Sequence, residues 1–110
     1  MGDLKMQVEM SIVDKLIDQI VKTAHPLRII LFGSAARGDM RPDSDIDLLI
    51  VMPEGTDSDS VGKLLYCEVG GVNVAFDMVV TTPDVLEKYK DNCALVYKWA
   101  LKEGREVYAA

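Results

Sequence analysis

A strand whose only carboxylates stand at its beginning is the feature that most constrains this fold. The segment from Asp45 to Met52 carries Asp45 and Asp47 and is otherwise apolar. A continuous apolar body is typical of a strand that other elements cover, whereas a half-exposed strand alternates apolar and polar residues. We therefore expect a sheet with helices packed on it, and two carboxylates at its rim.

The rest of the chain alternates between helical and extended patterns. The expected helices cover residues 7–23, 60–67, 83–90 and 92–103, and the other expected strands cover 27–32, 73–81 and, as a short edge strand, 105–108. At 110 residues without repeats or linkers, the chain is predicted to form a single domain, residues 1–110. The predicted class is α/β (α+β), a small mixed β-sheet with helices packed on one face.

Charge and hydropathy exclude two kinds of partner. The net charge of −6 opposes a surface for long nucleic acid, because such binding depends on clustered Lys and Arg. No apolar run approaches the roughly 18 residues that a membrane span needs, so we expect a cytoplasmic protein with no membrane partner. Cys67 and Cys93 are expected to be small buried side chains, and His25 to be a loop residue beside Pro26.

Asp45 and Asp47 are suited to binding metal ions. They lie two positions apart, so on a strand their side chains leave one face with Cα atoms about 7 Å apart. Paired carboxylates of this kind converge readily on the two Mg²⁺ ions of phosphoryl-transfer sites. The alternative is that Ser44 to Asp47 is only a turn that leads into the strand, since Ser and Asp favour turns.

Asp77 interrupts the otherwise apolar segment from Val74 to Val80. A buried carboxylate without a partner is costly, so we expect Asp77 to meet a cation. If its strand pairs beside the strand of Asp47, the two aspartates share one face and complete a set of three carboxylates around the metals. The alternative is a single salt bridge to Lys or Arg.

The turn at Gly33 and Ser34 offers a phosphate cradle. It follows the first strand, and its backbone N–H groups and hydroxyl suit phosphate oxygens. Arg37 follows within one turn, where its guanidinium could fork onto a phosphate or pair structurally with an aspartate such as Asp43.

Together these segments resemble the signature of the DNA polymerase β-like nucleotidyltransferases, in the subgroup of minimal nucleotidyltransferases. The matching residues are Gly33-Ser34-Ala35-Ala36-Arg37-Gly38, Ser44-Asp45-Ile46-Asp47 and the isolated Asp77. The resemblance implies the fold of that superfamily. It also implies that Gly33 and Ser34 contact the nucleotide triphosphate, and that Asp45, Asp47 and Asp77 are catalytic and bind two Mg²⁺ ions. We further expect Arg37 and Ser44 to take part in binding the nucleotide phosphates.

The activity implied by the resemblance is transfer of a nucleoside monophosphate, expected to be AMP from ATP, onto an acceptor hydroxyl with release of pyrophosphate. Small members of this group are often paired with a helical HEPN protein in toxin–antitoxin modules, where they act as antitoxins, in some cases by adenylylating the toxin. We therefore expect a HEPN-type partner, in a hetero- or homo-oligomer. Two alternatives stay open, a binding antitoxin without catalysis and a nucleotide-sensing regulatory domain.

Overall fold

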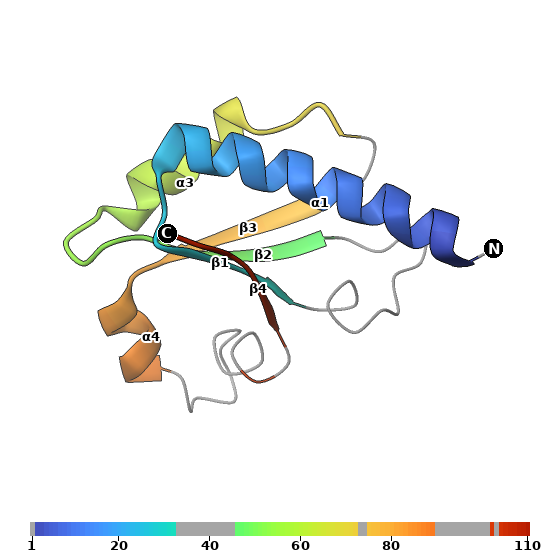
Figure 1. Ribbon diagram of the computed structural model, residues 1–110. Helices are drawn as coiled ribbons and strands as arrows, with labels where there is room; N and C mark the ends of the chain where they lie inside the picture. Colours follow the sequence, from blue (N-terminus) through green and yellow to red (C-terminus); the bar gives the residue numbers. More distant parts are fainter. Residues whose placement is uncertain (1, 33–45, 73–74, 90–101, 103) are drawn as a thin grey trace.

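The computed structural model describes residues 2–32, 46–72, 75–89, 102 and 104–110, with side chains of the first helix described from residue 12 onward. Its elements are α1 (Gly2–Ala24), β1 (Arg28–Phe32), β2 (Ile46–Val51), α3 (Ser58–Glu68), β3 (Phe76–Thr81), α4 (Pro83–Tyr89) and β4 (Arg105–Ala109) (Figure 1). The helix predicted over 92–103 lies outside the described residues, apart from Lys102, which is helical.

The strands form one mixed sheet in the order β3-β2-β1-β4. β1 pairs antiparallel with both β2 and β4, whereas β2 and β3 run parallel. Parallel neighbours need a crossover connection, and α3 supplies it between β2 and β3. The predicted class, a small mixed sheet with helices, is confirmed, including the edge strand at the C-terminal end of the chain.

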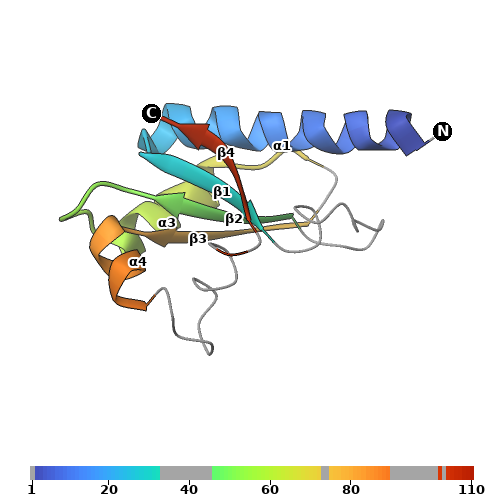
Figure 2. The same ribbon diagram turned by 60° about the horizontal axis from the view of Figure 1, so that its bottom comes forward.

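Two apolar clusters lie on opposite faces of the sheet. The larger one packs Leu16 and Ile20 of α1 and Leu65 of α3 against alternate residues of the central strands, among them Leu31 and Leu48. The smaller one joins the other strand residues to α4; its members are Ile30, Phe32, Leu49, Val51 and Leu86. The two longer helices thus share one face, while α4 belongs to the other face (Figures 1 and 2). The prediction that the helices pack on one face is therefore wrong for α4, because the alternate residues of β1 and β2 are also apolar and Leu86 covers them.

The first helix begins earlier than the apolar periodicity predicts and ends where expected. It starts at Gly2 rather than near residue 7, because Leu4, Lys5 and Met6 are good helix formers that extend it without contributing to the pattern. It ends at Ala24, and His25 adopts a left-handed backbone with φ of 51°. The N–H of His25 donates to the Val21 carbonyl at 3.0 Å, which caps the helix end.

α3 is fixed at both ends by polar contacts. Its N-cap is Asp57, whose side chain accepts hydrogen bonds from the backbone N–H groups of Asp59 and Ser60. Just beyond its C-terminus, the Gln19 amide of α1 clasps Gly70, with one hydrogen bond to the Gly70 carbonyl and one from the Gly70 N–H, both 2.9 Å. These contacts hold the turn after α3 against α1.

Cys67 corrects one expectation. The sequence context predicted a small buried side chain, but Cys67 is an exposed residue of α3. Leu65 of the helix and its C-cap residue Val69 are buried, so Cys67 falls on the outer side of the helix. Cys93 lies outside the described residues.

Candidate active site

Asp47 and Asp77 are brought together by the parallel ladder of β2 and β3. They are direct Cα partners in its register, between the pairs Ile46 with Phe76 and Leu48 with Met78. Paired residues of neighbouring strands point to the same face, with the strands about 4.8 Å apart. The expectation that the two carboxylates share a face is therefore confirmed.

The face that carries them is the one with the smaller apolar cluster. Side chains alternate along a strand, so Asp47 shares its face with Leu49 and Val51, and Asp77 shares its face with Val79. Leu49 and Val51 belong to the cluster that includes Leu86 of α4, and Val79 packs against it. Two acidic residues thus replace apolar ones where this face reaches the beginning of β2 and β3.

Asp77 is exposed, which corrects the expectation of a buried carboxylate. The apolar segment around it reads as a strand buried on both faces, but in the described sheet β3 is an outer strand with only β2 beside it. Phe76, Met78 and Val79 are accordingly only half-buried. Asp77 therefore does not need a cation to offset burial, and the argument for a metal there depends on its register with Asp47.

Asp47 is more enclosed than Asp77. It is half-buried on an interior strand, between Phe32 of β1 and Asp77 of β3 in the register. The pair thus consists of one half-buried carboxylate, Asp47, and one exposed carboxylate, Asp77.

The other predicted site residues, Gly33, Ser34, Arg37, Ser44 and Asp45, lie outside the described residues, and their roles stay predictions. The described strands fix where that segment starts and finishes. β1 ends at Phe32 and β2 begins at Ile46, and Phe32 is the register partner of Asp47. The chain therefore leaves and re-enters the sheet at the end where Asp47 and Asp77 lie.

In the described part of the chain no cluster of three or more His, Cys, Asp or Glu residues is poised to hold a metal ion. This agrees with the position of Asp45, the third predicted ligand, outside the described residues. The two described carboxylates fit a shared ion by register and by chemistry, because Mg²⁺ prefers carboxylate oxygens.

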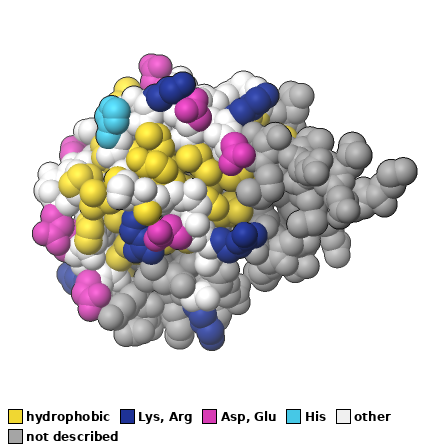
Figure 3. Space-filling model, viewed as in Figure 1, with side chains coloured by type: hydrophobic (Ala, Val, Ile, Leu, Met, Phe, Trp, Pro, Cys, Tyr) yellow, Lys and Arg dark blue, Asp and Glu magenta, His cyan; other side chains and the backbone are white. Residues whose placement is uncertain are grey.

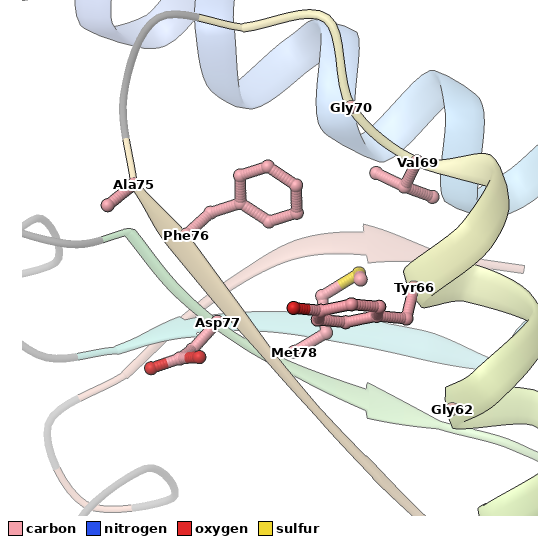
Figure 4. A pocket seen from close by; sticks show the side chains of 8 residues that line it. All are labelled: Gly62, Tyr66, Val69, Gly70, Ala75, Phe76, Asp77 and Met78. Carbon is pink, nitrogen blue, oxygen red and sulfur yellow. The ribbon is translucent and has the colours of Figure 1, made fainter.

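A cavity of about 540 Å³ opens between α3 and the start of β3. Its lining residues are Gly62, Tyr66, Val69, Gly70, Ala75, Phe76, Asp77 and Met78 (Figure 4). Figure 4 shows the aromatic and apolar side chains gathered on the α3 side of β3, with the Asp77 carboxylate leaving the strand on the other side. Asp77 thus belongs to the strand that borders the pocket, but its carboxylate lies on the opposite face of the sheet, which is the face of Asp47.

Sequence reasoning did not single out Tyr66, Phe76 or Met78 as site residues. Phe76 and Met78 were read as ordinary strand residues, and Tyr66 as part of a helix. A usable signal was present in the spacing of Gly62 and Tyr66, which are four apart and so lie on one side of a helix. Only the packing of α3 beside β3 places that side next to Phe76 and Met78.

The described surface carries both signs of charge. Figure 3 shows Lys and Arg side chains interspersed with Asp and Glu on the face seen in Figure 1, with no continuous basic patch among the side chains coloured there. One exposed pair is Lys22 with Asp18, at 2.9 Å. In the described residues no helix is both long and apolar enough to cross a membrane.

The described residues form an α+β domain, a four-stranded mixed sheet with two helices on one face and with paired carboxylates at the start of adjacent parallel strands. Residues 13–107 match the family described as the nucleotidyltransferase domain. The chain belongs to this family, and it is a nucleotidyltransferase.

Individual relatives agree with this assignment. A Methanocaldococcus jannaschii protein named as a protein adenylyltransferase is 38% identical over 81 residues, which cover 74% of this chain and 77% of that protein. A Sulfolobus solfataricus protein described as a nucleotidyltransferase has a similar fold, with a TM-score of 0.66, 20% identity, and 99% of this chain and 88% of that chain covered. A toxin–antitoxin structure with AMP-PNP is similar with a TM-score of 0.60, 18% identity, and 88% and 73% coverage.

Proposed function

We propose that this domain transfers AMP from ATP onto a hydroxyl group of a partner protein and thereby acts as an antitoxin toward a helical, HEPN-type toxin. The catalytic part of this proposal is based on one observation, the pairing of Asp47 with Asp77 in the register of β2 and β3, at the start of both strands. Adenylyl transfer is supported by the relative named as a protein adenylyltransferase. The antitoxin role is supported by the toxin–antitoxin structure of similar fold.

In this proposal Asp47 and Asp77, with Asp45, hold two Mg²⁺ ions, and Gly33, Ser34, Arg37 and Ser44 hold the nucleotide phosphates. Bound Mg²⁺ supplies positive charge that stabilises the negative charge developing on the transferred phosphoryl group. Asp47, fixed on an interior strand, orients the nucleotide end of the site. Asp77 lies at its outer side, where its carboxylate can accept the proton of an arriving hydroxyl.

The position of Asp77 also favours a macromolecular acceptor. Its exposure leaves the carboxylate accessible from solvent, on the side of β3 away from the cavity that Phe76 and Met78 line. A hydroxyl presented by a protein segment could reach Asp77 from that exposed side.

The test is transfer of label from each of the four NTPs, labelled at the α-phosphate, in the presence of Mg²⁺ and the product of any neighbouring gene that encodes a helical protein. Wild type is compared with Asp47→Asn and Asp77→Asn, and with Asp14→Asn, an exposed aspartate of α1, as a matched control. We expect label from ATP on the partner with wild type and Asp14→Asn only. If the chain forms a stable complex with the partner but no NTP gives label, the proposed transfer is wrong and the chain inhibits its partner by binding alone.

A further inference from the structure

The two outer strands of the described sheet differ in how their free edges are protected. Proteins commonly guard such edges with charged residues, proline or bulges, because an unpaired strand edge binds other strands. β4 carries Arg105 and Glu106, and its register with β1 shifts between Ile29 and Ile30. β3 has Asp77 as its only charged residue, contains no proline and pairs with β2 without a shift. β3 therefore offers an edge that another strand can join.

The backbone groups that face this edge belong to alternate residues of β3. The carbonyls of Ala75 and Thr81, both odd-numbered, accept hydrogen bonds from backbone N–H groups of β2 and of the residue after it, at 2.9 and 2.8 Å. The N–H and C=O groups of one strand residue point to the same side, and that side alternates along the strand. The even-numbered residues Phe76, Met78 and Val80 therefore direct these groups away from β2, to the outer edge.

An antiparallel strand on this edge would place one of its side chains directly beside the Asp77 carboxylate. Because Phe76 and Met78 would form the hydrogen-bonded pairs, the residue opposite Asp77 stands in a non-hydrogen-bonded pair, where Cα atoms are only about 4.5 Å apart. Paired residues point to the same face of a sheet. A hydroxyl residue at this position would lie on the face that carries Asp47 and Asp77, where Asp77 is exposed.

The neighbours of that hydroxyl residue would turn to the opposite face of the sheet. There Phe76 and Met78 line the cavity of about 540 Å³, together with Tyr66 and Val69 of the α3 side (Figure 4). Phe76 and Met78 are half-buried and Tyr66 is 84% exposed, so an incoming side chain can reach these apolar surfaces. The cavity thus suits apolar side chains immediately before and after the hydroxyl residue.

The charge of the chain adds a second preference. Asp47 and Asp77 share one face, and the whole chain has a net charge of −6. Side chains two positions from the hydroxyl residue would return to this carboxylate face. Lys or Arg at those positions is attracted to the face, whereas Asp or Glu is repelled.

We propose that the acceptor of the transferred AMP is an extended segment that pairs with the outer edge of β3. It carries a Ser, Thr or Tyr opposite Asp77, apolar residues on both sides of it and basic residues beyond them. This inference rests on the proposed function and names its substrate class. The hydroxyl oxygen attacks the α-phosphorus of ATP, and a P–O bond forms as the bond from that phosphorus to the α,β-bridging oxygen breaks. Pyrophosphate leaves with that electron pair, and the hydroxyl proton passes to the Asp77 carboxylate.

Binding at this edge is tested without catalysis, by amide hydrogen exchange measured with NMR. The probe is the synthetic peptide Lys-Ala-Lys-Val-Phe-Val-Lys-Ala-Lys, whose central Phe replaces the acceptor so that no transfer occurs. In the free chain the N–H groups of Phe76, Met78 and Val80 should exchange faster than those of the odd-numbered residues between them. The peptide should slow exchange at these three by at least about tenfold, because pairing protects them. Exchange that the peptide leaves unchanged would overturn the proposal.

N-methylation of the peptide supplies the matched control. Methyl groups on the nitrogens of both Val residues remove the donors that would face β3, so they should abolish the slowed exchange. A methyl group on the nitrogen of the central residue, which points away from β3, should leave the slowed exchange in place. Equal effects of the two modifications would contradict pairing at the edge.

Transfer is tested with the same peptide carrying Tyr at its centre, with Mg²⁺ and ATP labelled at the α-phosphate. We expect label on the central Tyr. Tyr66→Ala should raise the KM of the peptide several-fold and leave kcat nearly unchanged, because Tyr66 lies on the face opposite the carboxylates. Leu64→Ala removes an exposed apolar side chain of the same helix outside the cavity lining, and should behave like wild type. A loss of kcat in Tyr66→Ala, with unchanged thermal unfolding, would contradict the docking role.

Failure of this inference is distinguishable from failure of the proposed function. If the helical partner is labelled but neither it nor the peptide slows exchange along the edge of β3, the acceptor binds elsewhere and the proposed function stands. If exchange slows but neither peptide nor partner is labelled, both proposals are overturned. A chain that sediments as a dimer, with the even-numbered N–H groups of β3 already slow in exchange, would assign the edge to a second copy and overturn this inference alone.

Discussion

Asp47 and Asp77 are direct Cα partners on parallel strands, so the ladder between β2 and β3 sets the relation between two carboxylates that are distant in the sequence. Asp47 is half-buried on an interior strand, and Asp77 is exposed at the outer strand. The two positions should consequently respond differently to substitution.

Replacing Asp77 with Asn should abolish transfer while leaving the fold intact. We expect transfer to fall by at least about 100-fold, because metal-ion stabilisation worth several kcal/mol would be lost. The free energy of unfolding should change by less than about 0.5 kcal/mol, as for other exposed substitutions. Labelling of the partner and urea unfolding measure the two effects; a loss of activity that merely follows unfolding would contradict the metal-ligand role.

The two hydrogen bonds between the Gln19 side-chain amide and the Gly70 backbone should contribute measurably to the free energy of unfolding. Gln19→Leu leaves the N–H and the carbonyl of Gly70 without their part-buried partners, so we expect the free energy of unfolding to fall by about 1–3 kcal/mol. Lys22→Ala, which breaks the exposed pair with Asp18 on the same helix, should cost less than about 1 kcal/mol. Urea unfolding of both variants checks this order, and equal losses would contradict it.

Two glycine substitutions should have opposite effects. Gly62 lies inside α3 with space for a Cβ, so Gly62→Ala should raise the free energy of unfolding by about 0.5–1 kcal/mol. Gly55 also has space but adopts φ of +87°, so Gly55→Ala should lower it by about 1–2 kcal/mol through backbone strain. Thermal and urea unfolding provide the measurement, and a stabilising effect at Gly55 would contradict the assigned backbone.

The cap of α3 should make stability depend on pH. The hydrogen bond from the Ser60 side chain holds the pKa of Asp57 below its ordinary value of 3.8, helped by the backbone N–H groups of Ser60 and Asp59. A pKa depressed in the folded state contributes stability that is fully present above pH 3.8 and is lost as the pH falls through the lower, folded-state pKa.

Asp57→Ala should therefore melt below wild type at neutral pH, and the gap should narrow in acid below pH 3.8. Asp57→Asn, which keeps an uncharged cap, separates the charge from the hydrogen bonds. Thermal unfolding across the pH range measures the gap. A gap that stayed constant down to the lowest pH would show that the charge of Asp57 contributes nothing.

The sequence predicted the elements well where one physical signal dominated. Apolar runs located β1 and β2 to within one residue, and the His25-Pro26 pair marked the end of α1. The start of α3 was placed at Ser60 rather than Ser58, because several adjacent polar residues can cap a helix. The choice of Asp57 depends on side-chain geometry that spacing does not contain.

The site was harder to predict from the sequence. The apolar segment around Asp77 indicated a strand but not its place in the sheet, and the outer position of β3 made the expected burial wrong. Tyr66 was not identified because the role of an exposed aromatic residue on a helix depends on which residues lie near it in the folded chain. Its place beside Phe76 and Met78 arises from the crossover through α3, which local sequence patterns do not encode.

The parallel pairing of β2 and β3 also separates the parts of this chain that can vary from the parts that cannot. The segment 52–57 between β2 and α3 could change in length without altering the relation of Asp47 to Asp77, since the strand ladder alone sets that relation. A single-residue slip of β3 along β2 would instead turn one carboxylate to the opposite face. Over evolutionary time, insertions and deletions should therefore accumulate in that connection and be excluded from the two strands.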